Sequence, residues 1–242
     1  MSESLLTVES MSAWYGAARI LYDLNFNVGR GEVVALMGRN GAGKSTTMKT
    51  IMGLIAERHG SVKFNGRDIA RLKPFEIARH GLGFTPEDRR IFADLTVMEN
   101  LDIGRQPPRS FPDGTPAPLW TPAKLFALFP NLGEMPERLG NRMSGGEQQM
   151  LTVARTLMGN PLLVLLDEPS EGVAPLIVEQ MANTIIELKK EGLSILLSEQ
   201  NIHFAQLVSD RVYVLEKGQI HWQGTMTDLA GNLDVQRAYL TV

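Results

Sequence analysis

A glycine-rich segment between an apolar run and a helix-like segment places the strongest constraint on how this chain can fold. The apolar run covers 33–37, the helical pattern begins near Lys44, and the segment reads Gly38-Arg39-Asn40-Gly41-Ala42-Gly43-Lys44-Ser45-Thr46. The glycines permit a tight turn in which backbone N–H groups and the helix N-terminus point at anionic oxygens. The lysine reaches the outer phosphates and the serine hydroxyl can bind Mg²⁺. The sequence therefore predicts a strand–loop–helix unit that holds a triphosphate.

The composition of the 242-residue chain narrows the possibilities further. Hydrophobic residues make up 43%, which suffices for one packed core. A net charge of −3 gives no reason to expect nucleic acid as the main partner. The chain has no cysteine, and its four scattered histidines form no ligand cluster, so disulfides and thiolate metal sites are excluded. Without a leader pattern or a bilayer-length apolar run, we expect a cytoplasmic chain that meets a membrane only through partners.

Strand and helix patterns alternate along the chain, which predicts an α/β fold with antiparallel pieces at both ends. Asn65-Gly66 predicts a hairpin with a primed turn, and a second hairpin is predicted to turn at Lys217-Gly218. We expect a loop over 12–16 that carries two aromatic residues, Trp14 and Tyr15. The predicted strands are 5–8, 24–28, 33–37, 62–64, 67–69, 82–85, 162–166, 194–197, 212–215 and 219–222. The predicted helices are 44–52, 74–79, 144–158, 175–191 and 202–209, with short helices after 222.

The middle of the chain differs in composition. Six of the thirteen prolines lie within 106–122, which predicts an irregular insert and not a domain linker. A helix is predicted over 123–129, and 130–142 is predicted to lack regular structure. We expect contacts with partners in this third of the molecule.

Asp167 and Glu168 directly follow a continuous apolar run, as expected of a parallel strand buried on both faces. Functional groups commonly sit at the carboxyl ends of such strands. Asp167 could hold Mg²⁺ through water, and Glu168 could polarise the water that attacks the γ-phosphate. The alternative is a pair of surface acids after a strand.

A second glycine pair opens the helix before that strand. Ser144-Gly145-Gly146-Glu147 has the Ser-x-x-Glu pattern of a capping box, and in the simplest interpretation it is only a well-capped helix. In the functional interpretation its exposed amides offer a second anion site. One chain would then carry two phosphate-binding ends, which suggests that each completes a site on another chain.

The glycine-rich loop, the Ser-Gly-Gly motif and Leu165-Leu166-Asp167-Glu168-Pro169, in this order, resemble the ATP-binding subunit of an ABC transporter. The resemblance covers nearly the whole chain and implies one ABC ATPase domain over 1–242. It implies a P-loop NTPase core over 1–86 and 160–242, with a mixed sheet and an antiparallel β subdomain. A helical subdomain that carries the Ser-Gly-Gly motif would cover 87–159, with the proline-rich insert at 106–122.

The family resemblance also implies roles for individual residues. Tyr15 would stack on adenine, and Ser144 with Gly146 would bind the γ-phosphate of ATP on an opposing subunit. Catalysis would involve Glu168, Lys44 and Gln200. Mg²⁺ would be bound by Ser45, Asp167 and Glu87. The remaining nucleotide contacts would come from Gly38, Asn40, Gly41, Ala42, Gly43, Thr46, Gly145 and Glu147.

Three positions depart from the general family pattern. Glu87 stands where glutamine is usual, Ala174 where aspartate is usual, and Gln200 where a switch histidine is usual. A glutamine amide can donate to a phosphate oxygen but carries no charge, so Gln200 would do part of a histidine's work without titrating near neutral pH. Nearby His203 is more simply interpreted as a surface residue.

These departures, with Pro86-Glu87-x-Arg89-Arg90-x-Phe92 and Glu199-Gln200-Asn201, resemble the smaller ATPase subunit of branched-chain amino-acid importers. Urea and short-amide importers are close kin. The resemblance implies a second ABC ATPase subunit, membrane-spanning permeases, an extracytoplasmic binding protein, and a peripheral location on the cytoplasmic face of the membrane. A soluble non-transport ABC ATPase and a P-loop small-molecule kinase are the alternatives, and the kinase leaves the Ser-Gly-Gly motif unexplained. An exporter partnership also stays open.

Overall fold

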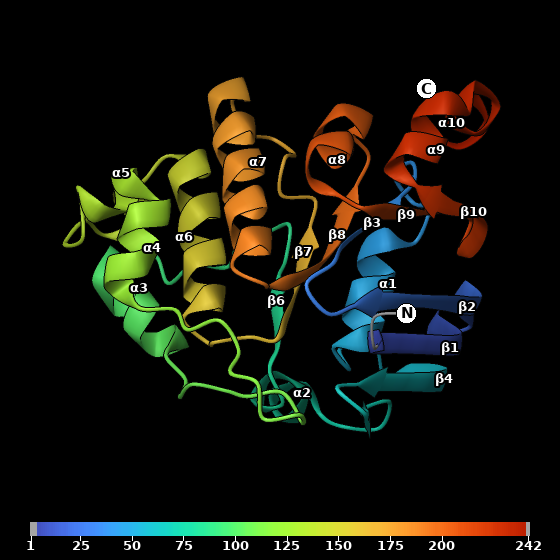
Figure 1. Cartoon of the computed structure of the whole chain (residues 1–242), viewed down its shortest axis with the longest axis horizontal. Coiled ribbons are helices and arrows are strands. Elements are labelled where there is room, and N and C mark those ends of the chain that lie inside the picture. Colours follow the sequence, from blue (N-terminus) through green and yellow to red (C-terminus); the bar gives the residue numbers. More distant parts are fainter. Residues whose placement is uncertain (1–3, 241–242) are drawn as a thin grey trace.

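Two β-sheets of different kinds form the frame of the protein in the computed structural model, which describes residues 4–240 (Figure 1). The strands are β1 (Ser4–Tyr15), β2 (Ala18–Gly29), β3 (Val33–Met37), β4 (Glu57–Phe64), β5 (Arg67–Asp68), β6 (Leu82–Thr85), β7 (Leu163–Asp167), β8 (Ser194–Glu199), β9 (Arg211–Glu216) and β10 (Gln219–Thr225). The helices are α1 (Lys44–Ile51), α2 (Pro74–Arg79), α3 (Val97–Gly104), α4 (Pro122–Leu128), α5 (Pro130–Gly133), α6 (Gly145–Leu157), α7 (Pro175–Lys190), α8 (Ile202–Val208), α9 (Met226–Gly231) and α10 (Leu233–Tyr239), with a 3₁₀ helix η1 (Gly140–Arg142).

The larger sheet has the order β10-β9-β3-β8-β7-β6 and is parallel except for β10 at its edge. Every residue of β3, β7 and β8 is buried. Alternate side chains face different cores. Leu36 and Leu165 pack with α1 and the smaller sheet, whereas Leu166 and Leu197 pack with α6 and α7. Figure 1 shows α7 and α8 on one side of this sheet and α1 on the other, so the predicted mixed α/β sheet is confirmed.

The smaller sheet is antiparallel, with the order β2-β1-β4-β5. The predicted loop over 12–16 is wrong, because β1 continues to Tyr15 and only Gly16 and Ala17 form the turn. The register of the β1–β2 pair shifts near Ser10 and Asp23, whose φ values are 48° and 51°. Such bulges break the two-residue alternation of a strand, which is the pattern that sequence interpretation depends on.

Helices α3 to α6 gather beside the large sheet (Figure 1). Helix α3 was not predicted, although Thr96 and Glu99 form a capping box at its start. The prediction of no regular structure over 130–142 was also wrong in part, because α5 and η1 lie there. Helix α5 and η1 are too short for apolar periodicity to reveal them. The division into a P-loop core and a helical subdomain, which the family resemblance implies, stays a prediction.

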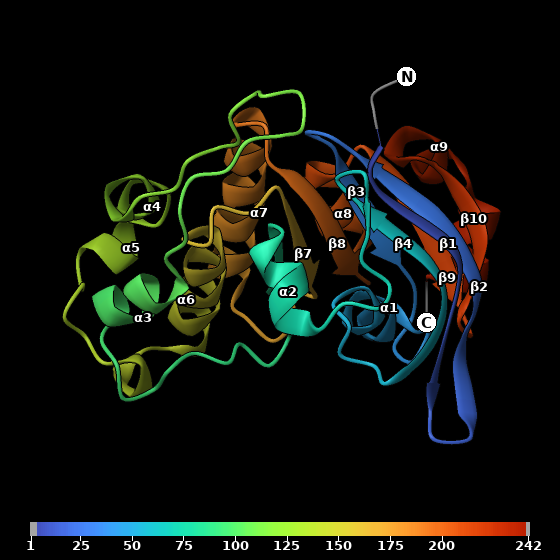
Figure 2. The same ribbon diagram turned by 90° about the horizontal axis from the view of Figure 1, so that it is seen from below.

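The proline-rich insert is irregular, as predicted, and Figure 2 shows it as an extended green loop between α3 and α4. Phe111 is buried in the core that contains the smaller sheet. The Arg30 guanidinium lies 3.5 Å from the Phe111 ring centroid and pairs with Asp113 at 2.8 Å. Asn160 accepts the backbone N–H of Trp120 at 2.8 Å. Packing against both cores thus holds the insert in place, although it forms no β-sheet or helix of its own.

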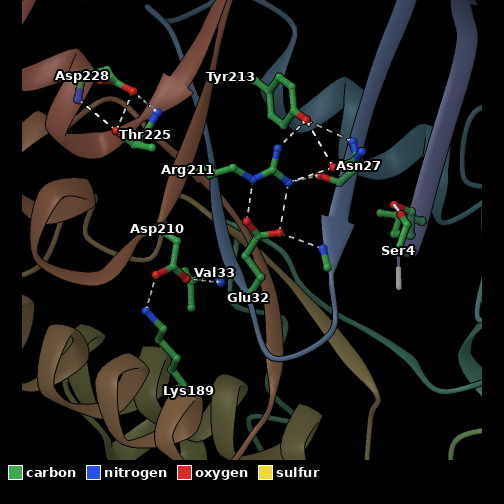
Figure 3. A network of polar contacts seen from close by, with 12 residues as sticks. Ser4, Asn27, Glu32, Val33, Lys189, Asp210, Arg211, Tyr213, Thr225 and Asp228 are labelled. Carbon is green, nitrogen blue, oxygen red and sulfur yellow. Dashed lines mark hydrogen bonds and ion pairs between the residues drawn. The ribbon is translucent and has the colours of Figure 1, made fainter. Parts of the chain in front are cut away.

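A polar network fixes the amino end of β3 (Figure 3). Arg211 on β9 pairs with Glu32 and donates to the Asn27 side chain at 2.8 Å. Asp210 accepts the backbone N–H of Val33 at 3.0 Å. These bonds tie both sheets together at this end of β3, while its carboxyl end opens into the glycine-rich loop.

None of the helices within residues 4–240 combines the length and the apolar character needed to span a bilayer.

The two predicted hairpin turns, at 65–66 and 217–218, are confirmed and allow a matched test. Gly66 and Gly218 follow Asn65 and Lys217, and all four residues have positive φ. A Cβ at residue 218 would lie 1.8 Å from the Ile20 carbonyl oxygen, whereas a Cβ at residue 66 would meet nothing within 4 Å.

We therefore expect Gly66→Ala to lower the free energy of unfolding by about 1–2 kcal/mol, the backbone cost alone. Gly218→Ala should add a further ~1–3 kcal/mol from the steric clash. Urea denaturation of the two variants and the wild type measures both contributions, the backbone cost and the steric clash. Equal losses for the two variants would contradict the close packing of Gly218 against Ile20.

Candidate functional site

The glycine-rich loop joins the carboxyl end of β3 to α1. Gly41 and Gly43 have φ values of 80° and 108°, a region in which residues with a Cβ are strained. A Cβ at residue 38 would lie 2.3 Å from the Leu215 carbonyl oxygen. These glycines are thus required by the fold of the loop itself, which aims the start of α1 at the space above it.

Lys44 lies at the first position of α1 and is almost fully buried, with a 3% exposed side chain. Its Nζ donates to the carbonyl oxygens of Gly38 at 2.7 Å and Arg39 at 3.2 Å, and it lies 2.9 Å from Glu168 Oε1. An ammonium held inside a loop of this kind can meet phosphate oxygens.

Asp167 ends β7 and lies beneath the loop. Its Oδ1 accepts hydrogen bonds from Ser45 Oγ at 2.9 Å and Ser198 Oγ at 2.6 Å. Burial raises the pKa of Asp167, although the bonds from Ser198 and Ser45 oppose that rise. The oxygen donors of Ser45 and Asp167 suit Mg²⁺, which prefers hydroxyl, carboxylate and phosphate oxygens. No group of three or more His, Asp or Glu side chains within residues 4–240 could hold a metal, so phosphate oxygens would complete this site.

Ser198 is a site residue that the sequence interpretation missed. It ends the apolar run of β8 and stands opposite Asp167 in the parallel register. Its hydroxyl donates to Asp167 and accepts the backbone N–H of Glu168 at 3.1 Å. The sequence offered one signal for Ser198, a polar residue at the end of an otherwise apolar strand. It could not show that Asp167 is the partner of Ser198, because that depends on which strands are neighbours in the sheet.

Glu168 is only 5% exposed and has a φ of 47°, a strained value for a residue with a side chain. Burial raises the pKa of its carboxyl group, but bonds to Glu171 and Lys44 and the charge of Lys44 outweigh it and hold the pKa below the usual value. Glu168 is therefore ionised at neutral pH and can accept a proton from a water molecule.

Gln200 and Glu171 flank this carboxylate. Gln200 Nε2 lies 3.3 Å from Glu171 Oε2 and makes a long 3.5 Å contact with Glu168 Oε2. The buried carboxylate of Glu199 accepts the backbone N–H groups of Ser170 and Gln200, which positions the Gln200 loop. Glu171 was not among the predicted site residues, so its contact with Gln200 comes from the structure alone.

A cavity of about 480 Å³ lies above the loop. It brings together most of the predicted nucleotide-binding and catalytic residues, including Glu87 and, at its rim, Tyr15 with 51% exposure. Gly38, Ala42 and Asp167 do not line it, because they lie in or under the loop, and Gln200 does not line it either. The lining residues are Tyr15, Ile20, Asn40, Gly41, Gly43, Lys44, Ser45, Thr46, Glu87, Glu168 and Glu171.

The Ser-Gly-Gly motif does not line this cavity. Ser144 caps α6, and its predicted capping box with Glu147 is confirmed, with the Ser144 backbone N–H donating to Glu147 at 2.6 Å. A Cβ at residue 145 would lie 2.7 Å from Arg89 Nη1, and one at residue 146 would lie 2.7 Å from Ile177 Cγ1. Gly146 is therefore needed for packing against Ile177, whereas at residue 145 the flexible end of Arg89 could move to make room. Their predicted contact with the nucleotide of another chain stays a prediction.

The neighbouring acids of the cavity make stability depend on pH. The hydrogen bond to Glu168, burial, and the charges of Glu168 and Glu87 raise the pKa of Glu171 from 4.5 to about 7, against the effect of Lys44. A raised pKa means that native Glu171 keeps its proton longer than the unfolded chain does. Its contribution to stability is full below pH 4.5 and is lost as the pH rises through 7.

We expect Glu171→Gln to raise the melting temperature relative to the wild type at pH 8, with little difference at pH 5. The amide removes the carboxylate that Glu168 repels at high pH. Thermal unfolding at several pH values measures the difference. Glu179→Gln, which removes the same charge from an exposed position of α7, should show no such trend. A difference for Glu171→Gln that does not change with pH would contradict the coupling.

Comparison with known proteins shows the relationship of this chain. A family model described as ABC transporter matches residues 21–171. The high-affinity branched-chain amino acid transport ATP-binding protein BraG of Pseudomonas aeruginosa is 41% identical over 236 residues, which cover 98% of this chain and 99% of that protein. The lipopolysaccharide export system ATP-binding protein LptB of Haemophilus influenzae is 33% identical and covers 98% and 97%.

Solved structures show the same fold. An ATP-binding cassette of an ABC transporter in its ADP conformation superposes with a TM-score of 0.79 at 27% identity, over 98% of this chain and 97% of that one. An ATP-binding subunit of an ABC transporter gives a TM-score of 0.78 at 30% identity, over 98% and 96%. The chain belongs to the ABC transporter family, as an ATP-binding subunit that hydrolyses ATP with Mg²⁺ as cofactor.

Proposed function

We propose that this chain energises an importer for branched-chain or other hydrophobic amino acids. The main support is the 41% identity to BraG over nearly the full length of both chains. A probable branched-chain amino acid transport ATP-binding protein, LivF of Archaeoglobus fulgidus, is 34% identical over 93% of this chain. LptB proteins are 32–33% identical, so export is a second candidate function. Urea and short amides remain alternative solutes, and a non-transport ATPase remains an alternative role.

The cavity supports a role for each of its charged residues. Lys44 and the loop amides would bind the β- and γ-phosphates of ATP, and Ser45, Asp167 and Glu87 would hold Mg²⁺. The metal ion would offset the charge that develops as the terminal phosphate bond breaks. Glu168 would take a proton from the attacking water while ADP leaves with the electrons of that bond. Gln200 would donate its amide to a phosphate oxygen.

The buried ion pair between Lys44 and Glu168 fits such a cycle. Lys44 Nζ and Glu168 Oε1 lie 2.9 Å apart, so each charge compensates the other. Phosphate oxygens would draw the ammonium away, and the Glu168 carboxylate would then be free to bind the attacking water. The base would become available only when substrate is present.

The placement of the Ser-Gly-Gly motif outside the cavity supports a dimer. Two subunits would close head to tail, so that Ser144 and Gly146 of each complete the nucleotide site of the other. The partner would be a second ABC ATPase subunit, identical or different. Closure and opening would be transmitted to permeases at the cytoplasmic face of the membrane, with a binding protein acting on their far side.

An apolar groove on the surface is a candidate site for contact with the permease. Four of the ten large apolar side chains exposed within residues 4–240 line this groove of about 560 Å³, a concentration typical of interaction sites. The Arg79 and Arg155 guanidiniums lie over two of its phenylalanine rings. We propose that an apolar cytoplasmic segment of the permease occupies it. The four side chains are Leu54, Phe75, Phe92 and Ile103.

Transport specificity can be tested with the chain reconstituted in liposomes with the permeases and binding protein encoded beside it. We expect leucine, but not urea or acetamide, to stimulate ATP hydrolysis through the binding protein. Glu168→Gln should lower hydrolysis by at least about 100-fold, since general-base catalysis contributes on that order.

The exposed Glu179→Gln variant is the matched control and should hydrolyse ATP like the wild type. Stimulation by urea or acetamide would replace the amino-acid assignment. Failure of the chain to associate with the permeases would favour the non-transport alternative.

The groove makes a separate prediction. Phe75→Ser should weaken co-purification with the permeases on the order of tenfold, the effect of losing one buried aromatic anchor. Leu207→Ser changes an apolar residue of α8 that is even more exposed than Phe75 and lies outside the groove, and it should have no effect. Pull-down at graded concentrations measures the difference. Equal retention of both variants would place the permease elsewhere.

A further inference from the structure

Three hydrogen-bond donors meet at the start of α6 without a partner in residues 4–240. Within the first turn, the N–H of Glu147 bonds to Ser144 Oγ and that of Gln148 to the Ser144 carbonyl oxygen. The N–H groups of Gly145 and Gly146 make no such bond in the described part of the chain. The third donor is the Arg89 guanidinium, which has neither a hydrogen bond nor an ion pair there.

Arg89 lies directly against the first glycine of the helix. A Cβ at residue 145 would be 2.7 Å from Arg89 Nη1, 3.3 Å from Cζ and 3.4 Å from Nη2. The Cα–Cβ direction in a helix tilts toward the N-terminus. The guanidinium lies in that direction from Gly145, toward the start of the helix.

The backbone holds Arg89 in this place. Its φ is 63° and that of Arg90 is 53°, two strained residues in succession. The Arg89 carbonyl oxygen accepts a bond from Thr152 Oγ1 at 2.8 Å. The next carbonyl, of Arg90, accepts one from Arg155 at 2.6 Å. Thr152 lies two turns after Gly145 on the same face of α6, so the Arg89 side chain runs along the helix toward its start.

This placement is electrostatically unfavourable without an anion. The N-terminus of a helix is its positive end, where cations are disfavoured. Two nearby acids are paired with other groups. Glu147 accepts the Ser144 backbone N–H and lies 3.9 Å from Arg138, and Asp88 pairs with Arg90 at 2.7 Å. An incoming anion would therefore be bound by two free amides and an uncompensated guanidinium.

We propose that Arg89 is a further binding residue for the γ-phosphate of the ATP held by the opposing subunit. This role rests on the composite site proposed above and adds to it the one full positive charge that the Ser-Gly-Gly motif lacks. A guanidinium can donate two parallel bonds to phosphate oxygens, which a lysine cannot do. Because Arg89 would act only across the dimer, it should not affect ATP binding by a single subunit.

The experiment compares Arg89→Ala with Arg90→Ala, both in the Glu168→Gln chain, which should retain ATP. Arg90 is the matched control because it is the next residue, carries the same charge, and is 69% exposed beside Asp88. Analytical ultracentrifugation with Mg-ATP measures dimerisation, and a fluorescent ATP analogue in dilute protein measures binding by the monomer. Arg89→Ala should weaken dimerisation by roughly tenfold to 100-fold, the effect of one charged hydrogen bond. Monomer binding should stay unchanged, and Arg89→Lys should recover only part of the loss.

The outcomes separate the two proposals. If the Glu168→Gln chain stays monomeric with Mg-ATP, both alone and when mixed with the second ATPase subunit of its transporter, the composite site is wrong and the role of Arg89 falls with it. If that chain dimerises and Arg89→Ala dimerises as well as Arg90→Ala, only the role of Arg89 is wrong. Equal weakening of monomer binding and dimerisation by Arg89→Ala would also overturn it, because the defect would then be in the fold.

Discussion

The parallel pairing of three fully buried strands is the constraint on which the site depends. β3, β8 and β7 lie side by side, and their carboxyl ends meet at one edge of the sheet. Lys44 follows the first strand, Ser198 lies near the end of the second and Asp167 ends the third. Residues more than 100 positions apart in the chain are thereby brought within hydrogen-bond distance, as in the bond from Ser45 to Asp167.

Burial of opposite charges at this edge is the main electrostatic feature of the site. Lys44 and Glu168 are 3% and 5% exposed, so each needs a compensating partner. They compensate each other in this structure, with Gln200 and Glu171 adding contacts to the carboxylate. Phosphate would compete for the lysine, which links nucleotide binding to release of the base. The hydrogen bond to Glu168 raises the pKa of Glu171, so Glu171 is the acid of this pair that keeps its proton to higher pH.

The start of α6 differs from this site because its free amides and the Arg89 guanidinium have no hydrogen-bond partner among residues 4–240. The space beside Gly145 is occupied by the Arg89 guanidinium and the space beside Gly146 by the Ile177 side chain. Gly146 is thus required by packing within the chain, in addition to any access that it gives to a ligand. The packed guanidinium gives that end a charge that the motif alone does not have, and this is why we assign it to phosphate.

The sequence by itself determined the local features. These include the glycine-rich loop between strand and helix, the capping box at Ser144, the apolar run before Asp167, and the hairpin turns at Gly66 and Gly218. Each is encoded by neighbouring residues, through backbone φ, hydrogen bonds within one helical turn, or apolar periodicity. The mixed α/β sheet and the family resemblance followed from their order along the chain.

Tertiary structure alone decided which of these features touch. The bulges of β1 and β2 that carry Tyr15 to the end of a strand depend on pairing with a partner strand. The bond of Ser198 to Asp167 depends on strand order, the contact of Glu171 with Gln200 on two adjacent loops, and the position of Arg89 on the packing of its loop against α6. Such contacts join residues distant in sequence, and local periodicity contains no information about them.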